Sequence, residues 1–192
     1  LKNGIARDVA NFVFTKIEPF AQYGFNKSHA AAYALIAYQT AFLKTYYKED
    51  FIAATMSTEL TNTSKLREFV EELKRLKIDI IRPSINKCFA EFKAETNQIY
   101  YGLGAIKNVG FEAISNIVKE REKNGIFNSI SNFLSRTESK NLNKLQLEGL
   151  IKSGSLDILD QNRKKLYENV PDYLKQSKSS DETNSDNQNL LF

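Results

Sequence analysis

A group of polar side chains stands directly before a long stretch of alanine, leucine and aromatic residues, and it could bind a phosphate. The group consists of Asn26, Lys27, Ser28 and His29. Lys27 supplies a positive charge, and His29 can donate a hydrogen bond to a phosphate. Ser28 or Asn26 could cap the helix that follows. This set suits a triphosphate or a DNA backbone, and the alternative is a plain helix cap with a histidine satisfied in the core.

A glycine-rich stretch from Tyr101 to Gly110 is the second candidate for phosphate chemistry. It is not a dinucleotide-binding loop, because the third glycine of that motif would fall on Lys107. It resembles a helix-hairpin-helix, in which an Ile-x-x-Val-Gly turn opens a second helix. The N–H groups of such a turn would point outward at a helix N-terminus, where unpaired donors and the helix dipole favour a phosphate. Such a contact reads the DNA backbone and not its sequence.

The residues expected to make this contact are Gly104, Ile106, Lys107, Asn108, Val109 and Gly110. Asn108 stands where the motif usually has glycine, and asparagine adopts the left-handed conformation more readily than other residues with a side chain. A plain turn between two helices is the alternative. A second, weaker copy of the hairpin is expected near Ser153, Gly154 and Ser155, where a helix around residues 145–151 ends.

The chain ends in a short apolar peptide behind a polar linker. Residues 177–189 have no apolar side chain and cannot bury enough surface to offset the cost of ordering, so we expect disorder there. Peptides of the form Gln-x-x-Leu-Phe bind a groove through the glutamine amide and apolar anchors. Here those residues are Gln188, Leu190, Leu191 and Phe192. A frayed tail is the alternative.

Composition removes several other classes of function. The 192 residues include one cysteine and one histidine, which excludes an internal disulfide and leaves no His/Cys set for zinc. The net charge of +4 permits a nucleic-acid partner without demanding one. No apolar stretch reaches the roughly 20 residues that a membrane helix needs, so no membrane partner is expected. The chain begins with Leu1 and has no signal-peptide pattern, so we expect a piece of a longer protein.

The elements that must position these residues are predicted to be mainly helical, with a small β-hairpin element. Residues 30–47 carry apolar side chains on nearly every side, which predicts a buried helix. Residues 64–77 show helical spacing of apolar positions, with Thr63 or Ser64 as the N-cap.

After this second helix, the pattern of apolar residues changes from helical spacing to one typical of strands. The isoleucines at 78, 80 and 81 predict a short strand, and the alternation between residues 89 and 101 around Thr96-Asn97 predicts a β-hairpin. From residue 102 to residue 176 the sequence predicts short helices joined by glycine-bearing turns.

Several specific blocks occur in a fixed order along most of the chain. They are Gly24 to Tyr33, Tyr38 to Thr40, Leu43-Lys44, Glu49 to Phe51, Arg82 to Asn86, Tyr101 to Lys107, Lys140 to Lys144 and Ser153 to Asp157. In this order they resemble the C-family of bacterial replicative DNA polymerases, the alpha subunits of DNA polymerase III. A collinear set of blocks is far more specific than any single block.

The resemblance implies four segments. These are the end of the helical fingers at 1–80, a strand and β-hairpin connector at 81–101, a tandem helix-hairpin-helix for duplex DNA at 102–176, and a linker with a clamp-binding peptide at 177–192. It implies duplex DNA, the sliding clamp and other replicase subunits as partners, and a deoxynucleoside triphosphate in the whole enzyme. A cytoplasmic location follows from the same resemblance. Asn189 departs from the apolar residue usual at its place in the clamp peptide, which should weaken that contact.

The resemblance also implies what this chain lacks. The carboxylates that hold two divalent metals, expected to be Mg, belong to a palm that nothing in this sequence matches. The chain alone is therefore expected to have no catalytic residue and no cofactor, and to be inactive as an enzyme. The alternatives are a stand-alone, non-catalytic helix-hairpin-helix adaptor for DNA and a purely helical scaffold.

Overall fold

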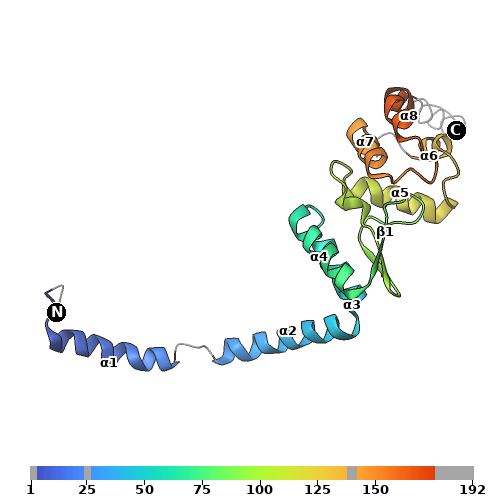
Figure 1. The fold of residues 1–192 in the computed structure, drawn as a ribbon. Coiled ribbons are helices and arrows are strands. Elements are labelled where there is room, and N and C mark those ends of the chain that lie inside the picture. The colour runs from blue at the N-terminus through green and yellow to red at the C-terminus, as the bar shows by residue number, and fades with distance from the viewer. Residues whose placement is uncertain (1–3, 24–26, 138–141, 176–192) are drawn as a thin grey trace, which may run out of the picture. The chain divides into compact units, whose positions relative to one another are not determined.

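The computed structural model describes residues 4–23, 27–137 and 142–175, and it divides the chain into two units (Figure 1). The first unit is residues 1–47 and the second is residues 48–192. Most of the described residues are helical, and a small three-stranded sheet lies in the second unit. The predicted fold class is therefore confirmed. Within the described residues, no helix is both long enough and apolar enough to cross a membrane.

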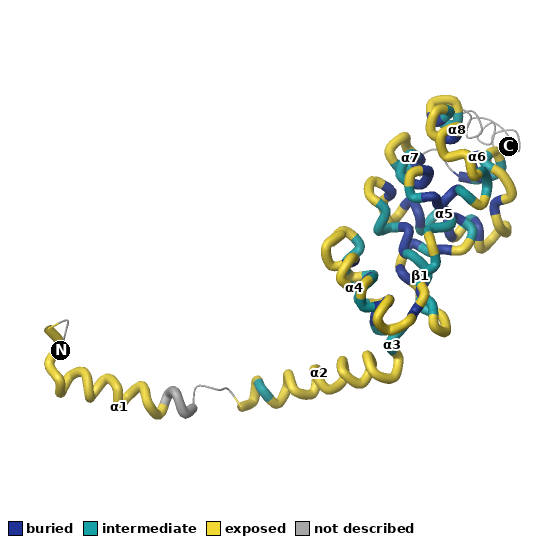
Figure 2. The backbone as a smooth tube through the Cα atoms, in the orientation of Figure 1, coloured by how far each residue is buried: buried dark blue, intermediate teal, exposed yellow. Residues whose placement is uncertain are grey.

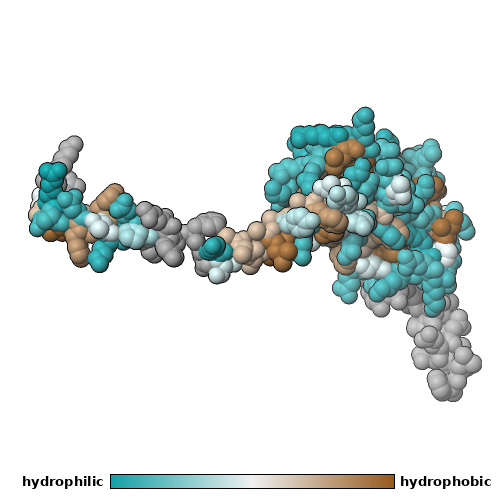
Figure 3. All heavy atoms as spheres, turned by 90° about the horizontal axis from the view of Figure 1, so that it is seen from below, coloured by the Kyte–Doolittle hydropathy of each residue, from teal (hydrophilic) through white to brown (hydrophobic). Residues whose placement is uncertain are grey.

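The first unit contains α1 (Arg7–Tyr23) and α2 (Lys27–Tyr46), and its helices are exposed along nearly their whole length (Figure 2). The helix predicted over residues 30–47 is present, but the prediction that it is buried is wrong, because α2 has no buried residue. Its apolar side chains form part of the surface (Figure 3). An all-round apolar pattern indicates what a helix can bury, whereas burial itself requires a partner to pack against.

In the second unit, α3 (Lys48–Thr58) and α4 (Thr63–Leu76) pack beside the sheet. The helix predicted over residues 64–77 is confirmed, but its predicted cap is wrong. The side chain of Asn62 accepts the Lys65 N–H at 3.2 Å, because the helix already begins at Thr63.

The sheet consists of β1 (Asp79–Ile81), β2 (Lys93–Glu95) and β3 (Gln98–Tyr100) in the order β1-β3-β2. The predicted strand and hairpin are confirmed. β2 and β3 are antiparallel, and Asn97 between them has a φ of 59°. The parallel pairing of β1 with β3 was not predicted, because it depends on a contact distant in sequence.

One face of the sheet shares a core with α3 and α4. This core contains Ile52, Ala53, Met56, Leu66, Leu73, Ile78, Phe92 and Ile99. The helices after the sheet surround a second core (Figure 2). They are the 3-10 helix η1 (Leu103–Ala105), α5 (Phe111–Asn124), α6 (Ile130–Arg136), α7 (Lys144–Ser153) and α8 (Arg163–Glu168). The segment boundaries predicted after residues 80, 101 and 176 stay predictions.

A buried arginine joins this second core to the loop between β1 and β2. The Arg121 side chain donates through one nitrogen to the carbonyls of Ile85 and Cys88, each at 2.7 Å. Its guanidinium also lies 5.2 Å from the centre of the Phe89 ring. Burial lowers the pKa of Arg121 from its ordinary value. The carbonyls replace water around the cation, so α5 holds this loop in place.

Candidate nucleic-acid interface

The turn between η1 and α5 has the backbone geometry of a tight hairpin. The Val109 N–H donates to the Ile106 carbonyl at 3.1 Å and closes the turn. Asn108 has a φ of 67°, which is the left-handed conformation expected for it, and Gly110 has a φ of 61°. Only glycine adopts the Gly110 conformation, with its ψ of 130°, without strain.

The helix that follows this turn begins without a cap. α4, α6, α7 and α8 each begin after an asparagine or serine whose side chain accepts an N–H of the first turn. α5 instead begins after Gly110, which has no side chain to do so. Among the described residues, nothing accepts a hydrogen bond from the N–H groups of Phe111 or Glu112. Both residues are exposed, and their N–H groups stand at the positive end of the α5 dipole.

Close packing beneath the turn fixes its position. Val109 is fully buried, whereas the neighbouring Lys107, Asn108 and Gly110 are exposed. Gly149 in α7 lies so close that an added Cβ would stand 2.7 Å from a Val109 methyl and 3.0 Å from the Lys107 carbonyl oxygen. The turn therefore presents its polar tip while α7 holds its apolar side.

The other residues predicted for this hairpin fit the same arrangement. The Gly104 N–H donates to the Ala90 carbonyl at 3.0 Å, and a Cβ at Gly104 would stand 2.8 Å from that oxygen. Ile106 is half-buried against the second core. Glu112 places a negative charge in the first turn of α5, beside the free N–H groups.

The second predicted hairpin has a different geometry. Gly154, with a φ of 80°, is the C-cap of α7, and its N–H donates to the Ile151 carbonyl at 3.0 Å. The Ser155 N–H donates to the Leu150 carbonyl at 3.0 Å, and Ser155 is fully buried. The hydroxyls of Ser153 and Ser155 hydrogen-bond with each other at 2.7 Å. The N–H groups of Gly154 and Ser155 are therefore already used within the chain.

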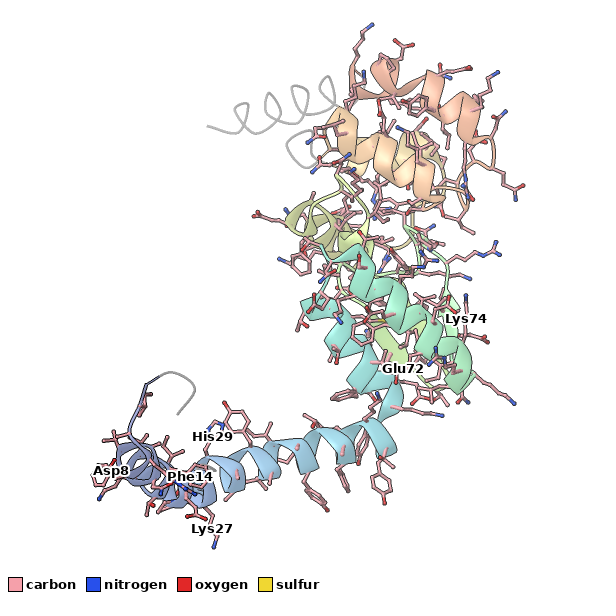
Figure 4. All side chains as sticks on the ribbon, turned by 60° about the vertical axis from the view of Figure 1, so that its left-hand side comes forward. Asp8, Phe14, Lys27, His29, Glu72 and Lys74 are labelled. Carbon is pink, nitrogen blue, oxygen red and sulfur yellow. The ribbon has the colours of Figure 1, made fainter. Side chains whose placement is uncertain are left out.

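The polar group before α2 is exposed where the structure describes it. Lys27, Ser28 and His29 are all exposed, which contradicts the alternative of a core histidine. α2 begins at Lys27, so Ser28 is a helical residue and not the cap, while Asn26 lies outside the described residues. The side chains of Lys27 and His29 point to opposite sides of α2 (Figure 4), as residues two apart on a helix must. The His29 ring lies 4.2 Å from that of Tyr33.

One further prediction falls outside the part of the chain that the structure describes. The clamp-binding residues Gln188, Leu190, Leu191 and Phe192 lie outside the described residues. Over residues 4–23, 27–137 and 142–175, no three His, Cys, Asp or Glu side chains are grouped to hold a metal ion.

Comparison with known proteins points to the same stretch of chain. A family model described as a helix-hairpin-helix motif matches residues 77–166. That range contains the sheet, the first turn and the second turn. It ends within α8.

The whole chain is also similar to curated proteins named DNA polymerase III subunit alpha. The protein of that name from Borreliella burgdorferi is 47% identical over 193 residues, covering 100% of this chain and 17% of the relative. The Xylella fastidiosa protein is 43% identical over 192 residues, covering 100% of this chain and 16% of the relative. The protein from Neisseria meningitidis serogroup A is 42% identical over 170 residues, covering 88% of this chain and 15% of the relative. This chain thus spans about a sixth of the length of these relatives.

Proposed function

Because the chain belongs to the family of bacterial DNA polymerase III alpha subunits, we propose that it works as part of a DNA-directed DNA polymerase and holds duplex DNA there. The observation that carries this proposal is the exposed Gly110 turn, with uncapped N–H groups at the start of α5. The match to the alpha subunits runs the length of the chain, which favours a polymerase segment over a stand-alone adaptor.

The proposed contact is made by the backbone. The N–H groups of Phe111 and Glu112 donate to the oxygens of one DNA phosphate, and the α5 dipole favours its negative charge. Lys107, which is exposed at the tip of the turn, adds a cation that displaces counterions from the duplex. None of these groups reads a base edge, so the contact is independent of sequence.

Binding of two unrelated duplexes of equal length tests this proposal. Fluorescence anisotropy should give similar affinities for both, and the affinity should fall steeply as salt rises, with a slope of about 0.9 per phosphate contacted. A duplex affinity that does not change with salt concentration, or a large difference in affinity between the two sequences, would contradict a backbone contact.

We further propose that the start of α2 faces the incoming nucleotide in the whole enzyme. The exposure of Lys27 and His29 supports a role in binding. Since the two side chains point to opposite sides of the helix, only one of them meets the triphosphate (Figure 4). In the whole subunit, Lys27→Ala and His29→Ala should therefore impair nucleotide incorporation unequally, and one of them should do so with little loss of DNA affinity. Equal losses of incorporation and DNA affinity in both variants would favour a structural role.

The C-terminal peptide is proposed to tether the polymerase to the sliding clamp. Gln188, Leu191 and Phe192 provide the amide and apolar anchors that such a groove takes. Truncating Phe192 should cost roughly 2 kcal/mol or more of binding free energy, as for an interface hot spot. Calorimetry of wild-type and Phe192→Ala peptides against purified clamp measures this difference. Equal binding by both would contradict the assignment.

The chemistry of synthesis is proposed to reside elsewhere in the polymerase. The family resemblance implies a palm whose carboxylates hold Mg and stabilise the transferring phosphoryl group. The described residues of this chain offer no such ligand set, so no catalytic step is assigned to them. Association with other replicase subunits, in the bacterial cytoplasm, belongs to the same proposal.

A further inference from the structure

The second turn borders a pocket that the first turn does not share. The pocket has a volume of about 400 Å³ and lies between the loop after β1 and the end of α7. Its wall includes Arg82, Ser84, Lys87, Gly154, Asp157 and Arg163. We call it the basic pocket.

The basic pocket has an excess of positive charge. Arg82 and Lys87 are exposed, and neither has an ion-pair partner among the described side chains. Arg163 is paired with Asp157 through two hydrogen bonds, of 2.7 Å from Nε and 2.5 Å from a terminal nitrogen. Three cations and one carboxylate leave a charge of +2 around the cavity. Such a surplus attracts an anion.

The wall of the basic pocket also contains an unsatisfied hydroxyl. The Ser84 Oγ is buried, and it has no hydrogen-bond partner within the described part of the chain. A buried hydroxyl without a partner costs free energy, which indicates a group that a bound molecule completes. An oxyanion would accept the hydrogen bond that this hydroxyl can donate.

The loop that carries these residues is held rigidly. Arg121 binds the carbonyls of Ile85 and Cys88 from one side. The Asn86 side chain accepts the Phe127 N–H at 2.9 Å and donates to the Phe127 carbonyl at 2.7 Å. A binding site on a fixed loop loses little conformational entropy when its ligand arrives.

We propose that the basic pocket binds a phosphate of the DNA backbone through the side chains of Arg82, Lys87 and Ser84. This inference rests on the proposed function, since it places a second contact on the same duplex. α7 links the two contacts: Gln146 lies beside Gly110, and Ser153 borders the basic pocket. The seven residues between these two positions rise about 10 Å along the helix, and the phosphates of one strand are spaced about 3.4 Å along the duplex axis, so both contacts fit on one short duplex.

The test compares two double variants of the chain that remove equal charge. The first variant, Arg82→Gln with Lys87→Gln, removes the two unpaired cations of the basic pocket. The control variant, Lys119→Gln with Lys123→Gln, removes two exposed cations of α5. The first pair should lower the slope of log affinity against log salt for a labelled duplex by roughly 1 to 2, and the second pair should change it far less. Circular dichroism and thermal unfolding establish that each variant is folded.

Separate outcomes bear on the two proposals. If the wild-type chain binds duplex and Gly110→Ala weakens it, but the basic-pocket pair keeps the wild-type slope, the pocket assignment is overturned and the proposed function stands. If neither the wild-type chain nor any variant binds duplex, the proposed function fails as well.

Two more measurements make the assignment specific. Ser84→Ala should lower duplex affinity about two- to threefold without lowering the unfolding temperature, because it removes a donor that has no partner inside the chain. Inorganic phosphate and pyrophosphate should shift the Arg82 and Lys87 amide resonances only at much higher concentration than the duplex does. Saturation of the pocket by free pyrophosphate as readily as by DNA would assign it to a small anion and overturn the backbone contact.

Discussion

The two glycine turns in the second unit look alike in sequence and differ in what their backbones can do. The Gly110 turn opens a helix, so the N–H groups after it have no carbonyl behind them to accept their hydrogen bonds. The Gly154 turn closes a helix, and the N–H groups of Gly154 and Ser155 return to carbonyls of α7. A glycine between helices therefore makes a donor site only where the next helix begins at it without a cap.

The difference extends to charge. The start of α5 lies at the positive end of a helix dipole, whereas Gly154 lies at the negative end of α7. An anion near Gly154 must therefore be held by side chains, and Arg82, Lys87 and Arg163 lie there. One turn offers its backbone, and the other depends on the cations around it.

The largest effect is expected from breaking the first turn. Gly110→Ala and Gly125→Ala each place a side chain at a positive φ, at opposite ends of α5, and each should cost about 1–3 kcal/mol of stability. Only Gly110→Ala should also lower duplex affinity, by about tenfold or more, which is about 1.4 kcal/mol. Unfolding in urea and anisotropy with labelled duplex measure the two quantities. Equal losses of affinity would mean that strain, and not the N–H donors, is responsible.

The second effect comes from the packing beneath the turn. Gly149→Ala should push against Val109 and the Lys107 carbonyl, and should cost about 1–3 kcal/mol of unfolding free energy. It should also lower duplex affinity several-fold, because the turn is displaced. Leu145→Ala is the control, since Leu145 is 57% exposed on the same helix. A folded Gly149→Ala chain with wild-type affinity would show that α7 does not position the turn.

A smaller effect is expected from the cation at the tip. Lys107→Gln should reduce the slope of log affinity against log salt by about 0.9, because one phosphate contact is lost. Lys164→Gln removes an exposed charge in α8, where Lys164 lies 3.8 Å from Glu168, and should leave the slope nearly unchanged. A slope that responds equally to both substitutions would indicate a diffuse charge effect and no contact at Lys107.

The smallest effect has the opposite sign. Glu112→Gln removes a carboxylate beside the free N–H groups of α5, so duplex affinity should rise about twofold at low salt. The same change should lower stability by about 0.3–1 kcal/mol, because an acidic residue in the first turn complements the helix dipole. An unchanged or weaker affinity would place the phosphate away from the start of α5.

Local sequence signals predicted much of the second unit. The spacing of Leu66, Phe69 and Leu73 gave the α4 helix, and Thr96-Asn97 gave the hairpin, because each depends on neighbours a few residues apart. The cap of α4 was predicted at Thr63 or Ser64 and lies at Asn62, since all three residues are suitable caps. The parallel pairing of β1 with β3 had no local signal.

The site was predicted only in part, for the same reason. The Gly110 turn follows from its own residues, and the lack of a capping residue directly before α5 was a signal in the sequence that the prediction did not use. The basic pocket joins residues about 70 positions apart, and no spacing rule reveals it. The exposure of α2 could not be predicted either, because its apolar pattern is compatible with burial against any partner.

An NMR titration of the isotope-labelled chain with short duplex DNA tests most directly whether the Gly110 turn holds the duplex. It follows the amide resonances as DNA is added. The Gly110, Phe111 and Glu112 amides should shift first and should return as salt is raised, because their N–H groups donate to a phosphate. The amide resonance of Gly125, at the other end of α5, should not shift. Shifts that spare Gly110 to Glu112 while other amides of the chain respond would contradict the proposal that this turn holds the duplex.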